Sequence, residues 1–304
     1  MRVVIAGLGI QGRKRRAIAG ENVVAVVDPV APEADFKEIE QVPIASYDAA
    51  CVCVPDDQKV PILRHLLANG KHVLVEKPML ATPAEIRELL ALSQAHRATC
   101  YTAYNHRFEP HIATLKGILD AQILGPLCLA RFFYGNGTAR DVRNSPWRDK
   151  GMGVFPDLGS HMLDMAHFLF GPHESLGELW SVNRFENKAP DHVIFGYPGR
   201  PVLEMEATLL SWRNSFSLDV HGELGSAHIH CLCKWGPSTL TVRKRKLPSG
   251  RPEETVETLE QPDPTWKIEY DHFLQLCQTG GTNLENDLWI QSKISHLGEL
   301  ILKA

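Results

Sequence analysis

The stretch VVIAGLGIQG, residues 3–12, decides the fold, because an apolar run leads directly into three closely spaced glycines. Arg2 to Ala6 predict a buried strand, and Arg13 to Ala19 predict a helix after the turn. A strand, a glycine turn and a helix in this order are typical of a dinucleotide-binding fold. The backbone must approach a pyrophosphate, whose charge is stabilised by N–H groups at the start of the helix. The predicted phosphate-binding residues are therefore Gly7, Gly9, Ile10, Gln11 and Gly12.

A second apolar run, Val23 to Val27, ends in Asp28, which lies 19 residues beyond Gly9 (28 − 9). A carboxylate at this position can accept both ribose hydroxyls of a dinucleotide. Its charge repels a 2′-phosphate, and Pro29 and Val30 add no cation, so the sequence favours NAD and leaves NADP as the alternative. The other interpretation of Asp28 is a turn residue at a strand end.

Strands and helices alternate over the next 75 residues or so, which is the period of βαβ units and predicts a parallel sheet. The expected strands are Ala49 to Val54, His72 to Val75 and Thr99 to Tyr104, and the expected helices are Lys59 to Ala68 and Pro83 to Ala95, with Thr82 as N-cap. Between Asp28 and Ala49 only Val42 to Ile44 could form a strand. Ala45 to Asp48 is too short for a crossover helix, so we expect a shortened adenine side.

Glu76-Lys77-Pro78 follows the strand His72 to Val75. A lysine at the carboxyl end of a parallel strand points into the crevice where ligands of such sheets bind. The alternative for Lys77 taken alone is a solvated loop lysine. Asn105 and Arg107 follow the last strand of this half in the same way.

The second half changes to short alternating strands separated by turns, which predict an α+β domain with a mainly antiparallel open sheet. The expected strands are Cys128 to Tyr134, Glu178 to Arg184, Val193 to Phe195, Leu203 to Leu210, Ser215 to His221, Ser226 to Ile229, Thr239 to Lys246 and Glu254 to Glu260. Helices Trp266 to Cys277 and Leu284 to Leu302 are expected to close the chain. We expect a first domain over residues 1–120 and a second over 121–304, with helix 284–302 able to pack back on the first.

Asp157, His161 and Asp164 are spaced so that they share one face if residues 157–170 are helical. A buried, hydrogen-bonded Asp–His pair is as good an interpretation as a catalytic one on this pattern alone. A metal site that adds His167 is disfavoured, because the four residues do not share a narrow face. Trp147 and Arg148 just before this segment are candidates for substrate binding, with ordinary packing as the alternative.

Composition excludes several classes of protein. The 304 residues are 44% hydrophobic and 22% charged, which is ordinary for a globular chain, and the net charge of −4 does not favour binding to nucleic acid. The basic cluster Arg13 to Arg16 is expected on the solvated and phosphate-facing sides of its helix, with a nucleic-acid patch as the alternative. No apolar run has the length of a membrane helix or the order of a signal peptide, and the seven cysteines fit a reducing compartment, so a soluble cytoplasmic protein is expected.

Taken together these motifs resemble the glucose-fructose oxidoreductase, inositol dehydrogenase and MocA (Gfo/Idh/MocA) family of NAD(P)-dependent enzymes. The glycine turn, Asp28, Pro55, Glu76-Lys77-Pro78, Asn105 with Arg107, and Asp157-Leu158-Gly159-Ser160-His161 occur in family order over essentially the whole chain. The resemblance rests on the combination, because each motif alone also occurs in other dinucleotide folds.

The resemblance implies roles for individual residues. Lys77 is expected to contact the nicotinamide ribose and the reacting hydroxyl, with the Lys77-Pro78 bond often cis. His161 is expected to be the general base or acid, and Asp157 to orient the substrate or the imidazole. Val54, Pro55, Glu76 and Asn105 are expected at the cofactor, and Arg107 at the substrate.

The expected function is therefore hydride transfer between NAD, with NADP as the alternative, and a secondary hydroxyl or ketone of a sugar, polyol or nucleotide-linked sugar. A histidine that titrates near neutrality suits removal of the hydroxyl proton, and a neighbouring lysine stabilises the alkoxide. The nicotinamide carries the hydride, so no metal is expected. The resemblance also implies a homo-oligomer, dimer or tetramer. The alternative from another class is a catalytically silent dinucleotide-binding regulator.

Overall fold

The computed structural model describes residues 1–145 and 148–304, and the chain divides into two units. The first unit contains Met1–Asn105 and Thr265–Gln291, and the second contains His106–Pro264 and Ser292–Ala304. The expected domain boundary at residue 120 and the return of the closing helix to the first domain stay predictions. No helix in the described ranges is both long and apolar enough to cross a membrane.

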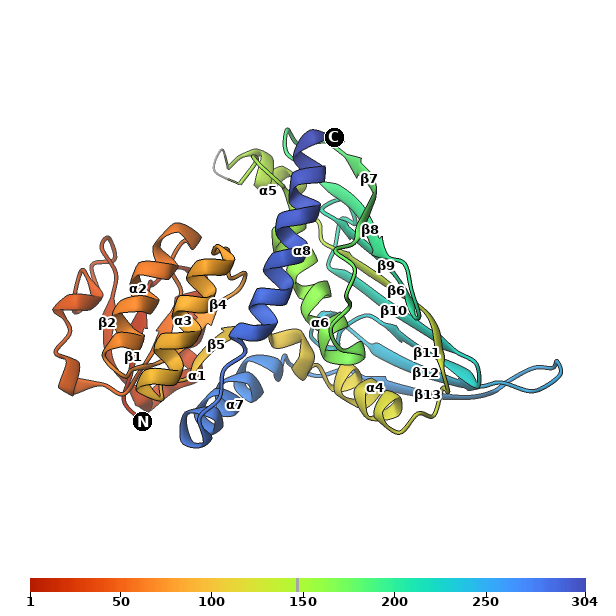
Figure 1. Ribbon diagram of the computed structural model, residues 1–304, viewed down its shortest axis with the longest axis horizontal. Helices are drawn as coiled ribbons and strands as arrows, with labels where there is room; N and C mark the ends of the chain where they lie inside the picture. The colour runs from red at the N-terminus through yellow and green to blue at the C-terminus, as the bar shows by residue number, and fades with distance from the viewer. Residues whose placement is uncertain (146–147) are drawn as a thin grey trace. The chain divides into compact units, whose positions relative to one another are not determined.

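The first unit is built on a five-stranded parallel sheet with the strand order β2-β1-β3-β4-β5. Its strands are β1 (Val3–Ala6), β2 (Val23–Val27), β3 (Ala49–Val52), β4 (His72–Glu76) and β5 (Cys100–Ala103). Its helices are α1 (Ile10–Ala19), α2 (Asp56–Ala68), α3 (Pro83–His96) and α7 (Thr265–Thr279). Helices α2 and α3 lie side by side, and α1 packs beside α7 (Figure 1). The predicted nucleotide-binding topology is confirmed.

Burial explains why these segments form strands. Strands β1 and β3 are buried at every residue, as expected for central strands of a parallel sheet covered on both faces. The edge strand β5 is equally buried. Helix α3 begins as predicted, since Thr82 and Glu85 form a reciprocal capping box and Pro83 stands at the first helical position.

The segment between β2 and β3 lacks both a full strand and a crossover helix. The candidate strand Val42 to Ile44 does not form: two 3₁₀ turns, Ile39–Gln41 and Ile44–Ser46, lie on either side of Val42, which is buried in the core of the first unit. The apolar Val42 side chain is thus buried without Val42 being part of a strand. Phe36 instead forms a single parallel bridge with Val27, so the shortened crossover that the sequence predicts is confirmed.

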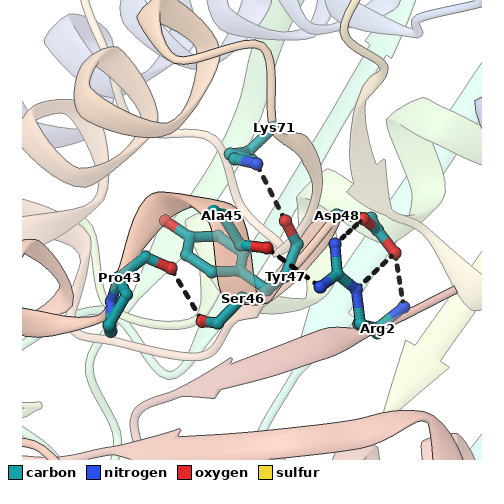
Figure 2. A network of polar contacts seen from close by, with 7 residues as sticks. All are labelled: Arg2, Pro43, Ala45, Ser46, Tyr47, Asp48 and Lys71. Carbon is teal, nitrogen blue, oxygen red and sulfur yellow. Dashed lines mark hydrogen bonds and ion pairs between the residues drawn. The ribbon is translucent and has the colours of Figure 1, made fainter.

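Polar contacts hold this short segment against the sheet (Figure 2). The Arg2 guanidinium donates to Asp48 Oδ1 at 2.7 Å and to the Ala45 carbonyl oxygen at 2.9 Å. Hydrogen bonds from Arg2 hold the pKa of Asp48 at about 2. On the other side, Lys71 Nζ donates to the carbonyl oxygen of Tyr47 at 2.8 Å, just before β4 begins. These bonds hold the segment before β3 in place, as packing of a crossover helix on the sheet would otherwise do.

The second unit contains an eight-stranded sheet with the order β13-β12-β11-β10-β6-β9-β8-β7, antiparallel throughout except for the parallel pair β6 and β9. Its strands are β6 (Leu127–Gly135), β7 (Glu178–Asn183), β8 (His192–Tyr197), β9 (Val202–Thr208), β10 (Ser215–Gly222), β11 (Gly225–His230), β12 (Ser238–Lys244) and β13 (Glu253–Leu259). Burial alternates along β10, where Phe216, Leu218 and Val220 are buried. The predicted mainly antiparallel sheet is confirmed.

The second unit also contains the helices α4 (Pro110–Asp120), α5 (Ala139–Arg143) and α6 (Ser160–Phe170) (Figure 1). Helix α8 (Leu284–Lys303) begins in the first unit and ends in the second. Neither α4 nor α5 is predicted from the sequence. A π-helical turn, Phe155–Gly159, runs directly into α6. The expected continuous helix from Asp157 is therefore interrupted in its first turn, because Asp157 lies in the wider π turn.

Candidate active site

The glycine loop fits a dinucleotide phosphate because two of its glycines are sterically required and the third faces open space. A Cβ on Gly7, whose φ is +89°, would lie 2.5 Å from the Cys53 carbonyl oxygen, and one on Gly12 would lie 1.8 Å from the carbonyl oxygen of Gly7. A Cβ on Gly9 would meet no protein atom within 4 Å. Gly9 is the N-cap of α1, which has no side-chain cap and no acidic residue in its first turn. Ile10 and Gln11 continue as exposed residues of that turn. The loop thus leaves a bare cradle at a helix N-terminus.

Asp28 lies at the carboxyl end of β2 and accepts hydrogen bonds from the glycine loop and from the residues that follow β2. Its Oδ2 accepts the N–H of Leu8 at 2.7 Å, and its Oδ1 accepts those of Val30 and Ala31 at 2.9 and 2.8 Å. Burial alone raises the pKa of Asp28, but these three donors lower it overall, so the carboxyl is charged. Asp28 is therefore both a turn residue and a fixed negative charge beside the glycine loop.

The other predicted cofactor residues of the first unit follow its parallel strands. Val54 and Pro55 come after β3, with Pro55 as the N-cap of α2, and Asn105 comes after β5. Since the strands are parallel, these residues lie at the same edge of the sheet as the glycine loop. Asn105 is buried and its Nδ2 donates to Thr265 Oγ1 at 2.7 Å.

Glu76-Lys77-Pro78 lies at the same edge, and hydrogen bonds hold its first and last residues. Glu76 ends β4, and its Oε1 accepts a hydrogen bond from Arg15 Nε at 2.6 Å. The carbonyl oxygen of Pro78 accepts one from Lys59 Nζ at 2.7 Å. The Lys77-Pro78 peptide bond is cis, as the resemblance implied.

Arg15 corrects the interpretation of the basic cluster Arg13 to Arg16. Instead of lying on a solvated or phosphate-facing side, the Arg15 side chain is 1% exposed and also bonds to Glu269 Oε2 at 2.7 Å. Its guanidinium lies 4.2 Å from the ring centroid of Trp266. Burial alone lowers the pKa of Arg15, but Glu269 and Glu76 raise it overall. Arg15 therefore joins α1, β4 and α7 within the first unit.

In the second unit His161 is buried on α6 against two aromatic rings. Its ring centroid lies 4.0 Å from that of His106 and 5.9 Å from that of Tyr134. Asp157 acts on Tyr134 as well, because burial and the Asp157 charge together raise the pKa of Tyr134. The structure thus brings Asp157 and His161 to one cluster around Tyr134.

Asp164 has a different partner from the one its spacing indicates. It is fully buried and accepts two hydrogen bonds from the Arg107 guanidinium, one of them from Nε at 3.1 Å. Arg107 also lies 5.3 Å from the ring centroid of Phe168 on α6. The charge of Arg107, a predicted substrate residue, is therefore balanced by Asp164.

Sequence reasoning missed His106 and Tyr134, which lie beside His161. It also missed Lys234 and Trp235, which lie beside those two rings. Lys234 Nζ lies 3.3 Å from His106 Nε2 and 3.5 Å from Asp263 Oδ2. The Trp235 ring lies 5.7 Å from that of Tyr134. His106 stands between two residues that the sequence did single out, but nothing in the sequence linked Lys234 or Trp235 to it.

The structure gives few contacts for the two other predicted substrate residues, Arg148 and Trp147. The Arg148 N–H donates to the Ser145 carbonyl oxygen at 2.8 Å, and Trp147 lies outside the described residues. Within residues 1–145 and 148–304, no group of three or more His, Cys, Asp or Glu side chains is arranged to hold a metal ion.

Comparison with known families agrees with this architecture over both units. Residues 1–104 match the model described as an oxidoreductase family with an NAD-binding Rossmann fold, and residues 112–228 match the GFO/IDH/MocA C-terminal domain. The chain belongs to the Gfo/Idh/MocA oxidoreductase family. Family membership assigns NAD binding to the Rossmann fold of the first unit, and its bare glycine cradle fits that group.

Named relatives of this Gfo/Idh/MocA chain are dehydrogenases or uncharacterised oxidoreductases. It is 32% identical to the uncharacterized oxidoreductase YdgJ of Escherichia coli (strain K12) over 59% of this chain and 52% of that one. It is 30% identical to trans-1,2-dihydrobenzene-1,2-diol dehydrogenase of Sus scrofa over 62% of this chain and 57% of that one. The chain thus spans little more than half the length of these relatives. Levoglucosan dehydrogenase in complex with NADH has the same fold, with a TM-score of 0.80, 17% identity and coverage of 100% of this chain and 96% of that one.

Proposed function

We propose that this protein is an NAD-dependent dehydrogenase or reductase acting on a secondary hydroxyl or ketone of a sugar, a polyol or a nucleotide-linked sugar. The observation that carries the proposal is the Glu76-Lys77-Pro78 turn, which is held at both ends on the sheet edge that also bears the glycine loop. The names of its relatives support the substrate class, since one acts on a cyclic diol and a fold neighbour on an anhydrosugar.

The proposed chemistry assigns one task to each side chain. When bound, the nicotinamide supplies the hydride acceptor or donor. His161 takes the hydroxyl proton during oxidation or returns it during reduction, and Lys77 stabilises the negative charge that develops on the oxygen. Asp157 orients the substrate or the His161 imidazole. Arg107 and Arg148, with Trp147, are the proposed substrate contacts, and Val54, Pro55, Glu76 and Asn105 the cofactor contacts.

The surroundings of His161 support its role as a base. The Lys234 ammonium beside His106 Nε2 disfavours a proton on that nitrogen, because two positive charges 3.3 Å apart repel strongly. The His161 ring lies 4.0 Å from this His106 ring, so an uncharged His106 leaves no second cation in contact with His161 when it takes a proton.

The charge at Asp28 supports NAD over NADP. A 2′-phosphate would meet this fixed carboxylate, and the nearby cations are already engaged. Arg13 forms an ion pair with Glu33 at 2.6 Å, and Lys37 Nζ donates to the Ala31 carbonyl oxygen at 3.2 Å.

We also propose a cytoplasmic homo-oligomer, dimer or tetramer, that associates through the polar face of the large sheet. Ion pairs cross this face between neighbouring strands, as in Arg131 with Glu204 and Arg243 with Glu254. Alternating charges of this kind can pair with a second copy of themselves across a two-fold axis. The seven cysteines are all unbridged, which fits a reducing compartment.

The experiment is calorimetric binding of NADH and NADPH, followed by a panel of polyols, sugars and nucleotide sugars with the tighter cofactor. We expect NADH to bind at least tenfold more tightly, and Lys77→Ala and His161→Ala to lower kcat roughly 100- to 10,000-fold on the substrate found. Tight NADH binding with no turnover on any substrate would instead favour the catalytically silent regulator.

A further inference from the structure

Lys59 on α2 is a buried cation that has no part in the proposed chemistry. Its side chain is 3% exposed, whereas the preceding residues Asp56, Asp57 and Gln58 are exposed. Its Nζ donates to the Pro78 carbonyl oxygen at 2.7 Å and pairs with Asp56 Oδ1 at 2.6 Å. Burial lowers the pKa of Lys59, and Asp56 opposes that effect. An ammonium is buried in this way only where polar partners compensate for its lost hydration, so both contacts define where it sits.

The position of Lys59 matters because Pro78 directly follows Lys77. On the other side of Lys77, the Glu76 carboxylate is bound by the buried Arg15 guanidinium at 2.6 Å. The residue that carries the proposed alkoxide-stabilising ammonium is thus flanked by two fixed points. Arg15 fixes the end of β4, and Lys59 fixes the backbone beyond it. Because a side chain departs from its own Cα, holding the Glu76 side chain on one side and the Pro78 carbonyl on the other limits the positions that the Lys77 ammonium can reach.

We propose that Lys59 is a positioning residue for Lys77: its buried ammonium holds the backbone after Lys77 so that the Lys77 side chain meets the reacting oxygen. The inference rests on the proposed function, since it takes Lys77 to act in catalysis. Lys59 itself has internal partners on both sides, Asp56 and the Pro78 carbonyl, and so acts through Lys77. A displacement of about 1 Å in a reacting group can lower a rate by two orders of magnitude, so loss of this bond should be visible in kcat.

Lys59→Met tests this, because methionine keeps most of the length and apolar character while removing the donor. Lys71→Met is the matched control, since Lys71 also donates to a backbone carbonyl, that of Tyr47, but at the opposite end of β4 (Figure 2). Lys59→Arg restores a cationic donor. We would measure kcat, KM, the NADH dissociation constant, thermal unfolding, and hydrogen exchange of the amides of residues 77 and 79–81. Should Lys59→Met fail to fold, Lys59→Leu, which also lacks a donor, takes its place.

We expect Lys59→Met to lower kcat about 10- to 100-fold, with KM and the NADH dissociation constant changed less than about threefold, and to speed exchange over residues 77 and 79–81. Lys59→Arg should recover most of kcat, and Lys71→Met should leave both kcat and that exchange unchanged. An unchanged kcat and exchange in Lys59→Met, or an equal loss in Lys71→Met, would overturn the inference.

The proposed function is tested separately in the same series with the wild type and Lys77→Ala. If the wild type turns over no substrate, the proposed function fails, and the exchange data alone then decide whether Lys59 holds the turn. If the wild type is active and Lys77→Ala is not, an active Lys59→Met variant overturns only the positioning role.

Discussion

Replacing Arg15 with methionine should destabilise the first unit far more than replacing an exposed arginine. The Arg15 side chain is 1% exposed, and it is the ion-pair partner of Glu269, which is 0% exposed, and of Glu76, which is 12% exposed. Arg15→Met would leave two carboxylates close together without their shared cation. Breaking a buried ion pair by removing one partner costs about 3–5 kcal/mol, and the stacking of Arg15 on Trp266 would also be lost.

The loss should depend on pH in a direction opposite to ordinary acid denaturation. Without Arg15, burial raises the folded-state pKa of Glu269 above its value in the unfolded chain. A folded state that binds more protons than the unfolded state becomes more stable as pH falls. The variant should therefore recover part of its deficit between about pH 7 and pH 5, and Glu269→Gln placed on the Arg15→Met background should recover part of it at pH 7.

The assay is urea unfolding followed by circular dichroism at both pH values, with hydrogen exchange of α7 to report on the first unit. Arg64→Met is the control, since Arg64 pairs with Glu88 at 2.7 Å while both side chains are at least 39% exposed. Exposed pairs contribute little, so this variant should unfold almost like the wild type. The reasoning is refuted if Arg15→Met is no less stable than Arg64→Met, or if lowering the pH adds to its deficit.

Three further predictions concern the same unit. Gly9→Ala should keep the wild-type melting temperature but weaken NADH binding. Gly12→Ala should lower the melting temperature and also weaken NADH binding, because its Cβ would lie 1.8 Å from a carbonyl oxygen. Thermal unfolding and calorimetry would separate these outcomes. Asp28→Asn should shift the ratio of NADPH to NADH affinity towards NADPH by tenfold or more, since the repelling charge is removed, and titration with both cofactors would measure the ratio. His72 Nδ1 accepts the Thr99 N–H, and burial lowers the pKa of His72 below 6.5. The contribution of His72 to stability should therefore be complete above pH 6.5 and fall as the pH drops below it. His72→Gln should flatten this pH dependence in urea unfolding, and an unchanged slope would contradict the assignment.

The sequence predicted the fold well where local chemistry decides it. Glycine spacing, apolar runs and the Thr82 cap act within a few residues, so their consequences can be derived without knowing the partners. The segment before β3 was harder, because Val42 is buried from a turn and an apolar triplet does not distinguish that from a short strand.

The candidate site was less predictable because its polar partners come from distant parts of the chain. Lys234 lies 128 residues from His106, and no periodicity connects them. Arg15 is different, since a local signal existed: Gly12, Arg15 and Ala19 are the buried residues of α1 and follow helical spacing. That spacing places Arg15 on the buried face, although residue type alone favours the surface. Helical position was the better guide here.

Arg15 also shows why the first unit depends on the end of the chain. Its partner Glu269 lies 254 residues further on, because residues 106–264 stand between β5 and α7. The entropic cost of closing so long a loop grows only with the logarithm of its length, so α7 can complete the unit across this interval. Two carboxylates from α7 and β4 meet one guanidinium on the helix that starts at the glycine cradle. The helix that follows the glycine loop and the segment that carries Lys77 are thereby tied to one buried charge cluster.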